Sequence, residues 1–434
     1  MKWTWEACYD FLNPSIRSQK TDPIISDKSE DPSQEAENMV EVETYIRQID
    51  PTRLEEVVRE LFGKKTIRMA DWTAEPIHGG LDRNNCLIRC RGHAEDGEKS
   101  LPWSLVIKIT GKVADNDDPA GYQYWKREAL VYQTQLRDRL PPDLSAPRCL
   151  GVDEHGDDTV WIWMEDIRDD LGGNWQMEAY GQAAHQLGRF NGAFLAGKPL
   201  PSEPWLAKKF LRNYVERAAP MIAFIRNNPQ HELVRSLYGS NLPLILAMWE
   251  IRADLLDILE GMPQVFCHQD AFRRNLFQQQ GRLMAIDWGF CGNAPAGSEL
   301  VPLIVVALSL NEIPYSRSRE FEQLCLDSYV KGLREAGAQV SARSVRRSFV
   351  LSILLRYVFG GNIGDILPAL LDENRRTWLA ENIGQPIEKT STTSAEESGY
   401  FVTVFVRSLQ LMGLRRLLKV IGYAIWFRLG GITK

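Results

Sequence analysis

The sequence lacks the motifs and composition that mark several common protein classes. Its six histidines form no HExxH or HxxxH pair, so a zinc hydrolase has no support. Its seven cysteines are scattered without a CxxC pair or a zinc-ligand spacing, which fits reduced thiols better than a disulfide framework. The net charge of -6 argues against a dedicated nucleic-acid-binding protein.

Long apolar runs are missing as well. No stretch of eighteen or more uncharged apolar residues occurs, so we expect no membrane-spanning helix. Glu6 and Asp10 fall where a secretory signal would need its apolar segment. Together with the cysteine pattern, these absences predict a cytoplasmic protein.

The composition that is present is that of a globular protein. Hydrophobic residues make up 44% and charged residues 25% of the chain, which are ordinary values. The length of 434 residues allows two or three domains, or one enzyme with two lobes.

The first part of the chain has the pattern of a disordered extension followed by a sheet. Residues 1–45 are expected to be disordered, because most of them are polar or charged. Asp50-Pro51 and Gly63 bound a short helix. Three short apolar segments with Gly-rich turns follow and predict an antiparallel meander, then a helix over 121–139 and two more strands up to residue 167.

The second part is almost entirely helical in pattern, apart from a segment at 264–290. A sheet-rich region before a helix-rich one predicts an α+β protein with two lobes. We expect an N-lobe over 46–167 and a helical C-lobe over 168–385. A linker and a basic amphipathic helix should then occupy 386–434.

The segment 264–290 concentrates the polar chemistry. It reads as strand, loop, strand, turn and strand, and it brings together Asp270, Asn275 and Asp287. Two carboxylates and an amide oxygen are ligands suited to Mg²⁺. A carboxylate not used on the metal can accept a proton from a hydroxyl nucleophile. This division of labour is what phosphoryl transfer from ATP requires.

The same residues resemble a known family motif. His268, Asp270 and Asn275 match the pattern HxDxxxxN, and "AIDWG" at 285–289 matches the hydrophobic-Asp-Trp motif that follows it. Over about residues 65–380 the chain resembles the aminoglycoside phosphotransferase and choline kinase-like family, which has a protein-kinase-like fold: a small antiparallel-sheet N-lobe with one helix and a large, mainly helical C-lobe. The resemblance implies that Asp270 is the catalytic base, that Asn275 and Asp287 hold Mg²⁺, and that His268 braces the loop.

A lysine and a glutamate upstream need each other as partners. Lys108 lies in the apolar strand "SLVIKIT", and Glu128 lies in an apolar stripe of the following helix. Burying either charge alone would be costly, so we expect an ion pair, with two unrelated surface residues as the alternative. The resemblance implies that Lys108 holds the α and β phosphates of ATP and that Glu128 orients it.

Weaker assignments complete the nucleotide site. Gly79-Gly80 would let backbone N–H groups approach phosphate, although a Gly-Gly turn is also an ordinary hairpin turn. By resemblance, the backbone of Glu165 and Ile167 would face adenine. Glu299 stands where the family has an aspartate, which leaves the role of that position open.

The acceptor is predicted only as a class. A catalytic carboxylate implies a hydroxyl group on a small molecule, and the family acts on antibiotics, amino alcohols and sugars. Acids at 165–170 and Trp175 could favour a cationic acceptor, or they could be solvated surface. Arg273 and Arg274 could stabilise the transferred phosphoryl group or form salt bridges. A catalytically silent kinase-like binding protein is the alternative function. The donor could be ATP or GTP, and the oligomeric state is not predicted.

The C-terminal segment 400–434 is basic and amphipathic. No acid occurs after Glu397, and "LRRLLKVIGYAIWFRL" is similar to the C-terminal segment of bacterial cell-wall amino-sugar kinases. A membrane surface and the protein's own C-lobe compete for the apolar side of this helix, and we expect it to pack on the lobe. That apolar side is formed by Leu414, Leu417, Leu418, Ile421 and Ile425.

Overall fold

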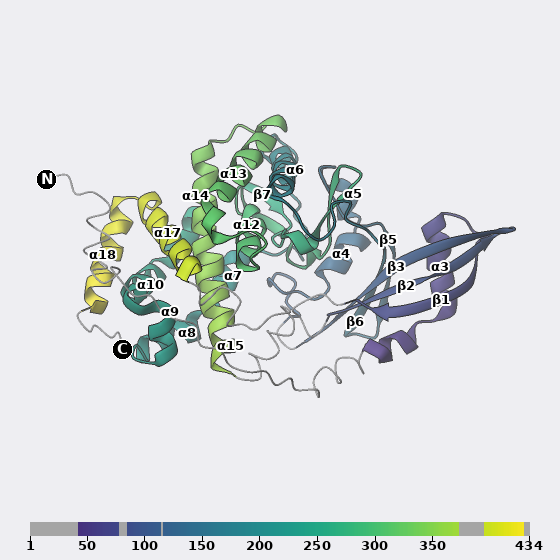
Figure 1. Cartoon of the computed structure of the whole chain (residues 1–434), viewed down its shortest axis with the longest axis horizontal. Coiled ribbons are helices and arrows are strands. Elements are labelled where there is room, and N and C mark those ends of the chain that lie inside the picture. The colour runs from purple at the N-terminus through teal and green to yellow at the C-terminus, as the bar shows by residue number, and fades with distance from the viewer. Residues whose placement is uncertain (1–41, 78–84, 114–115, 373–394, 429–434) are drawn as a thin grey trace.

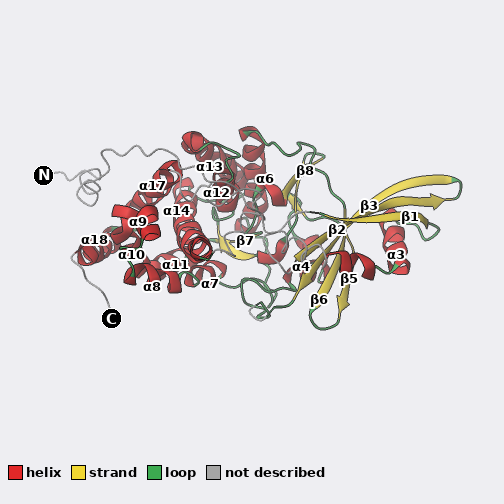
Figure 2. Ribbon diagram, turned by 60° about the horizontal axis from the view of Figure 1, so that its bottom comes forward, coloured by secondary structure: helices red, strands yellow, loops and turns green. Residues whose placement is uncertain are grey.

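The computed structural model of the chain describes residues 42–77, 85–113, 116–372 and 395–428. A twisted antiparallel sheet forms one end of the elongated molecule, and a mainly helical body forms the rest (Figure 1). Figure 2 shows the strands gathered at the sheet end and the helices at the opposite end. The predicted α+β organisation with two lobes is confirmed.

The N-lobe sheet has five strands in the order β1-β2-β3-β6-β5, and every neighbouring pair is antiparallel. Its β2–β3 hairpin extends as far as the pair Asp96–Lys99. Gly97, in the turn between them, has the left-handed conformation (φ 66°). The strand bounds are β1 Arg68–Pro76, β2 Asn85–Asp96, β3 Lys99–Gly111, β5 Cys149–His155 and β6 Thr159–Glu165.

Helix α3 (Pro51–Phe62) covers one face of this sheet. Asp50 caps its first turn by accepting a hydrogen bond from Thr52 N at 2.9 Å, and Gly63 ends it with φ 63°, as the sequence predicts. Strand β6 is buried on both faces: Trp161 and Trp163 pack in the cluster under α3. Its alternate residues join the larger core that runs into the C-lobe, which ties the two lobes together through β6.

Two expectations about the N-lobe are wrong in detail. Residues 42–48 are helical, and Tyr45 and Ile46 pack on the sheet core, so the expected disordered extension does not reach residue 45. Residues 1–41 lie outside the described residues. The helix expected over 121–139 is two short helices, α4 (Arg127–Gln133) and α5 (Leu136–Arg139), because Gln135 takes the left-handed conformation (φ 55°) between them.

The C-lobe is built from helices around a small set of strands. Helices α6 and α13 pack along one another through glycines that allow close approach, because a Cβ on Gly188 would lie 2.2 Å from Tyr329 O. The helices are α6 Met177–Leu195, α7 Phe210–Glu216, α8 Ala219–Asn227, α9 Glu232–Tyr238, α10 Leu242–Glu250, α11 Arg252–Glu260, α12 Leu300–Ser309, α13 Ser318–Glu335 and α14 Ala342–Ile353.

The strands predicted within residues 264–290 are present. Strand β7 (Gln264–Cys267) precedes the polar loop, and β8 (Leu276–Gln279) and β9 (Arg282–Ala285) form the hairpin after it. Strand β7 pairs with β10 (Gly292–Pro295), and β9 pairs in parallel with the short β4 (Leu144–Ser145). The polar loop and the end of β9 are therefore fixed by separate pairings on both sides.

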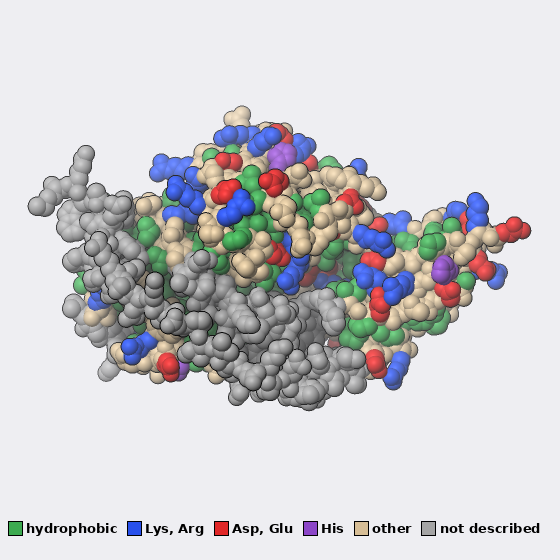
Figure 3. Space-filling view, viewed as in Figure 1, with side chains coloured by type: hydrophobic (Ala, Val, Ile, Leu, Met, Phe, Trp, Pro, Cys, Tyr) green, Lys and Arg blue, Asp and Glu red, His purple; other side chains and the backbone are tan. Residues whose placement is uncertain are grey.

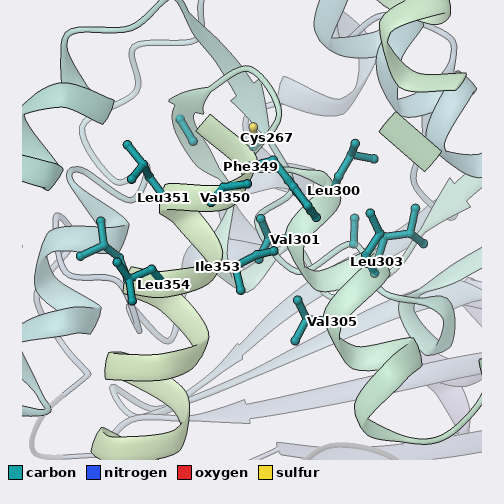
Figure 4. Packing of buried hydrophobic residues seen from close by; sticks show 14 of the residues in the cluster. Cys267, Leu300, Val301, Leu303, Val305, Phe349, Val350, Leu351, Ile353 and Leu354 are labelled. Atoms are coloured by element: carbon teal, nitrogen blue, oxygen red, sulfur yellow. The ribbon is translucent and has the colours of Figure 1, made fainter. Parts of the chain in front are cut away.

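A long apolar helix crosses the middle of the C-lobe. After α14 it continues as the π-helical stretch η5 (Leu354–Ile366) and then α15 (Leu367–Leu371). By length and composition Ala342–Leu371 could span a membrane, which the sequence expectation missed, but 61% of its apolar window is buried in the lobe. Figure 4 shows side chains of α14 and α12 packed together close to Cys267.

The C-terminal segment forms two helices instead of the single one predicted. They are α17 (Ala395–Leu411) and α18 (Leu414–Arg428), separated at Gly413, which has φ 85°. The segment packs on the C-lobe as expected, but α18 does so through Val420 and Ala424, which are buried. On the predicted apolar side, Leu414, Leu418 and Ile425 are exposed, which contradicts the prediction, whereas Leu417 packs on the core as expected.

Candidate active site

The two lobes meet at a buried ammonium group. Lys108 lies on β3, the middle strand of the sheet, paired with Leu87 on one side and Ile162 on the other. Its Nζ lies 2.5 Å from Glu128 Oε2 on α4 and 2.8 Å from Asp287 Oδ1 after β9. The predicted ion pair is present, and it is extended by a carboxylate 179 positions away.

The charges in this cluster stabilise one another. Burial opposes the charged form of Lys108, but attraction to Asp287 and Glu128 outweighs it, so the pKa of Lys108 is raised. Burial also opposes the charged form of Asp287, yet the charge and hydrogen bond of Lys108 bring its pKa below the ordinary value. Lys108 and Asp287 are therefore both ionised at neutral pH.

Asp287 is held in a conformation that a non-glycine residue rarely adopts. Its backbone has φ 65° and ψ 63°, the left-handed region. Its N–H donates to Glu128 Oε1 at 3.1 Å, so Glu128 binds both Lys108 and the Asp287 backbone. Such strain persists only where surrounding contacts determine the backbone, and it is common at functional sites.

The loop after β7 presents Asp270 and Asn275 together. The side-chain amide of Asn275 donates to Asp270 Oδ2 at 3.0 Å and to its carbonyl at 3.1 Å. Ile286 N donates to the Asn275 carbonyl at 3.0 Å, which joins this loop to the strand end that carries Asp287. Asp270, Asn275 and Asp287 thus converge as the sequence predicts.

His268 braces the loop from inside. It is fully buried, its Nε2 lies 2.9 Å from the Ile286 carbonyl, and its Nδ1 accepts a hydrogen bond from Asp270 N at 3.2 Å. This pattern assigns the proton to Nε2 of a neutral ring. Burial lowers the pKa of His268 to about 4, which agrees with that assignment.

Arg356 is a site residue that the sequence analysis missed. It comes from η5, and its Nη2 lies 3.1 Å from Asp270 Oδ1, while its Nη1 donates to the Gln269 carbonyl. Burial raises the pKa of Asp270 to about 6, and the charge of Arg356 works against this rise. Asp270 therefore stays mostly ionised at neutral pH but is a stronger base than an ordinary aspartate.

Glu299, whose role the sequence left open, holds the backbone of the same loop. It is fully buried at the start of α12 and accepts hydrogen bonds from His268 N at 2.8 Å and Gln269 N at 3.1 Å. Burial raises its pKa to about 7. Glu299 therefore holds the backbone of the loop in place.

Arg127, next to Glu128, is a second residue that was missed. Its guanidinium is fully buried and donates to backbone carbonyls, among them Trp205 at 2.8 Å and Gly289 at 2.7 Å. Gly289 follows Asp287 by two positions. Arg127 thus links α4 of the N-lobe to the turn that carries Asp287, and among the described residues it forms no salt bridge.

Other predicted site residues are placed less directly. Gly79 and Gly80 lie outside the described residues. The backbone N–H of Glu165, at the end of β6, already donates to Arg148 O at 3.0 Å. Ile167 lies two positions further along, and in the described chain its backbone makes no hydrogen bond. The assignment of these two backbones to adenine stays a prediction.

The charged residues weighed for acceptor binding have structural roles. Arg273 forms a salt bridge with Glu312 at 3.1 Å, the second of the two predicted possibilities, while Arg274 is exposed. Among the acids at 165–170, Asp166 binds Arg89 and Asp169 accepts from the buried Trp175 at 2.7 Å. These acids are therefore occupied by protein contacts.

Asp287 and Asn275 each have a side-chain oxygen of the kind that binds a small divalent cation. Lys108 contacts Oδ1 of Asp287, which leaves Oδ2 of this 40%-exposed carboxylate, and Asn275 uses its nitrogen toward Asp270, which leaves its oxygen. Two hard oxygen ligands suit Mg²⁺, which completes its sphere with phosphate and water. No cluster of three or more His, Cys, Asp or Glu residues suited to a metal occurs in the described ranges, so a metal held by protein alone has no support there.

Comparisons with known proteins agree with this geometry. Residues 118–329 match the model of the phosphotransferase enzyme family. No curated protein matches the chain.

Among solved structures, a spectinomycin phosphotransferase in complex with ADP and spectinomycin has 15% identity and a TM-score of 0.50, covering 82% of this chain and 99% of that one. This likeness shows the same protein-kinase-like fold. An amicoumacin kinase in complex with AMP-PNP has 14% identity and a TM-score of 0.48, with 82% of this chain and 99% of that chain covered. A choline/ethanolamine kinase family protein from Mesorhizobium loti has 14% identity and a TM-score of 0.40, with 82% and 94% covered.

Proposed function

The chain belongs to the phosphotransferase enzyme family over residues 118–329, and on that basis we propose that it transfers the γ-phosphoryl group of ATP, with Mg²⁺, to a hydroxyl group of a small molecule. One observation carries the proposal most directly. Lys108, Glu128 and Asp287, from three distant segments, form one charged cluster at the junction of the lobes. Burying the charges of Lys108 and Glu128 is costly, and buried charged groups of this kind are common at functional sites.

Lys108 and Glu128 would position the nucleotide. The ammonium group of Lys108 is directed toward the lobe junction by Glu128 and is charged, so it can bind phosphate oxygens. Arg127 and Glu128 both hold the turn after β9, so binding of phosphate by Lys108 is coupled to the position of Asp287.

Asp287 and Asn275 would hold Mg²⁺ through their remaining side-chain oxygens. The metal would neutralise charge on the phosphates when bound. Asn275 also donates to Asp270, so the same side chain orients the base relative to the metal site. These roles are carried over from the family motif and agree with the observed contacts.

Asp270 would act as the general base. It accepts the proton of the acceptor hydroxyl as the hydroxyl oxygen forms a bond to the γ-phosphorus and the bond to the β-phosphate oxygen breaks, giving ADP and a phosphate monoester. Its pKa of about 6 keeps it ionised at neutral pH and closer to the ideal value for a base than an ordinary aspartate.

The charges around Asp270 bear on the acceptor. Arg356 is in direct contact with the base, and among the acids at 165–170 Asp166 is already paired with Arg89. A cationic group beside the reacting hydroxyl would meet Arg356 at close range. We therefore favour a neutral or anionic acceptor, such as a sugar, over a polycationic antibiotic.

The alternative of a catalytically silent scaffold has no specific observation in its favour. A silent relative would be expected to have lost at least one member of the polar set, and here all members are present and each contacts another member. The set is Lys108, Glu128, Asp270, Asn275 and Asp287.

The test is a screen of hydroxyl-bearing sugars, amino alcohols and antibiotics for ADP release that depends on the acceptor. The purified full chain is compared with Asp270→Asn and, as a matched control, with Asp157→Asn at an exposed carboxylate of the N-lobe. The proposal requires activity in the wild type and the control but not in Asp270→Asn. Failure of the wild type to bind Mg·ATP by calorimetry would contradict it.

A further inference from the structure

Helix α18 presents an unusual apolar surface to solvent. Of the eight exposed large hydrophobic side chains in the described residues, five lie on this one helix, and Leu414 and Leu418 are 71% and 59% exposed. The five are Leu414, Leu418, Tyr423, Ile425 and Trp426. We call them the α18 outer face.

The α18 outer face spans about half of the helix circumference, because Trp426 lies about 120° and Tyr423 about 180° from Leu414. At 3.6 residues per turn, Leu414, Leu418 and Ile425 fall within about 40° of one another around the helix. The opposite side holds Val420 and Ala424 against the lobe, and α18 contacts α10 closely. Lys419 is tied to Asp254 of α11 at 2.9 Å. The helix is thus anchored by the buried Val420 and Ala424 together with the partly buried Leu417 and Phe427, while Leu414, Leu418 and Ile425 are exposed.

Basic residues accompany this surface. Helix α18 carries no acid, and Arg415 is exposed on its outer side. Arg347 of α14 is close enough to Arg416 and Arg343 that their charges add to burial in lowering its pKa. Within the described residues, the buried Nε of Arg347 has no hydrogen-bond partner. We call Arg343, Arg347, Arg415 and Arg416 the basic cluster; Figure 3 shows blue side chains gathered over the neighbouring end of α14.

We propose that α18 is an interfacial helix that binds an anionic lipid bilayer, with its outer face in the headgroup region and the basic cluster on lipid phosphates. Apolar residues with Trp and Tyr beside Arg and Lys are the composition of helices that lie in such an interface. At 15 residues, α18 is about 22 Å long and too short to span the hydrocarbon core. Within the described residues, the helix Ala342–Leu371 is long and apolar enough to span, but 61% of its apolar window is buried in the lobe.

The position of α18 fits this attachment. It lies at the end of the molecule farthest from the N-lobe sheet (Figure 1). Binding through this end keeps the N-lobe sheet, whose strand β3 carries Lys108, away from the bilayer. The proposal goes beyond phosphoryl transfer and does not depend on it.

The test measures co-sedimentation of the full chain with phosphatidylcholine vesicles, with and without phosphatidylglycerol. Wild type should bind only the anionic vesicles, and added salt should weaken binding. Leu414→Ser with Leu418→Ser should lower the partition coefficient at least about tenfold. Arg343→Gln with Arg415→Gln should lower it about 25-fold, near fivefold for each charge.

Matched control variants distinguish binding by this surface from non-specific adsorption to vesicles. Leu171→Ser with Leu200→Ser removes exposed leucines elsewhere, and Arg282→Gln removes an exposed arginine on β9; both should bind as wild type does. Unchanged melting temperatures and Mg·ATP affinity in all variants would show that the fold is intact.

Three results would overturn the proposal. One is no binding of wild type to anionic vesicles. Another is equal binding by the α18 variants and wild type. The third is a wild-type dimer, seen by analytical ultracentrifugation, that the two leucine substitutions dissociate; the outer face would then be an interface between copies of this chain.

Discussion

Arg356 Nη2 lies 3.1 Å from Asp270 Oδ1, although the two residues are 86 positions apart. The contact places a permanent positive charge on the proposed base. It also explains why deep burial raises the pKa of Asp270 only to about 6. The pKa of Asp270 is therefore set by two opposing effects: burial of the loop raises it, and the charge of Arg356 on η5 lowers it.

The pH dependence of activity should follow from this balance. A base works when ionised, so kcat/KM should be full well above pH 6 and fall as the pH drops through about 6. Arg356→Gln removes the opposing charge, so the acidic limb should move to higher pH, while Arg356→Lys should move it less. A pH profile with saturating Mg·ATP measures this. If the acidic limb of the kcat/KM profile does not move in Arg356→Gln, a group other than Asp270 is responsible for it.

Asp270→Asn should abolish most of the phosphoryl transfer and leave nucleotide binding intact. The amide keeps the shape of the side chain and can still contact Arg356, but it cannot accept the proton. We expect kcat to fall about 10²- to 10⁴-fold with little change in the Kd of Mg·ATP. Turnover and calorimetry on the same preparation separate these effects, and unchanged turnover would remove Asp270 from its role.

Asp287→Ala should weaken nucleotide binding that depends on Mg²⁺. The substitution removes a metal ligand and also leaves Lys108 with Glu128 alone as its close carboxylate. We expect the affinity for Mg·ATP to fall at least about tenfold, with a smaller change for ATP in the presence of a chelator. Equal losses with and without Mg²⁺ would indicate that Asp287 acts only through Lys108.

Glu299→Gln should destabilise the loop after β7. One oxygen that accepts from His268 N or Gln269 N becomes an amide nitrogen, which leaves a buried backbone donor unpaired. We expect a loss of about 1–3 kcal/mol in the free energy of unfolding. Urea denaturation measures it, with Glu95→Gln, an exposed glutamate on β2, as the control. A loss no larger than the control would show that the two hydrogen bonds contribute little.

Helix α17 should contribute strongly to C-lobe stability. Phe405 is buried in the core that α17 shares with the rest of the lobe. Phe405→Ala should cost about 3–5 kcal/mol, while Gln410→Ala on the exposed side should cost little. Deleting residues 400–434 should lower the melting temperature and increase binding of an apolar dye. A truncated chain that melts as wild type does would contradict the role of α17.

Local sequence was enough to predict the main cluster. Lys108, Glu128 and Asp270 are polar residues in apolar segments, and partners for such residues can be inferred without knowing the fold. The match of residues 118–329 to the phosphotransferase enzyme family confirms the predicted resemblance over that part of the chain and the prediction of a small-molecule kinase. The individual site assignments stay predictions.

Contacts made by tertiary packing were not predictable in the same way. Arg356 does stand alone in the apolar run "SFVLSILLRYVFGG", the same signal that marked Lys108, but its partner could not be named from sequence. The buried side of α18 was predicted wrongly in part, because helical periodicity finds the most apolar side, whereas the lobe is contacted by Val420 and Ala424 as well as Leu417.

Gln269 has a left-handed backbone (φ 73°), and its two peptide groups bind elements far apart in sequence. Its N–H donates to Glu299 at the start of α12, and its carbonyl accepts from Arg356 of η5. The conformational entropy of this loop is thus lost when the chain folds, not when a substrate arrives. Amide hydrogen exchange around Asp270 should be slow in the free protein and change little on addition of Mg·ATP.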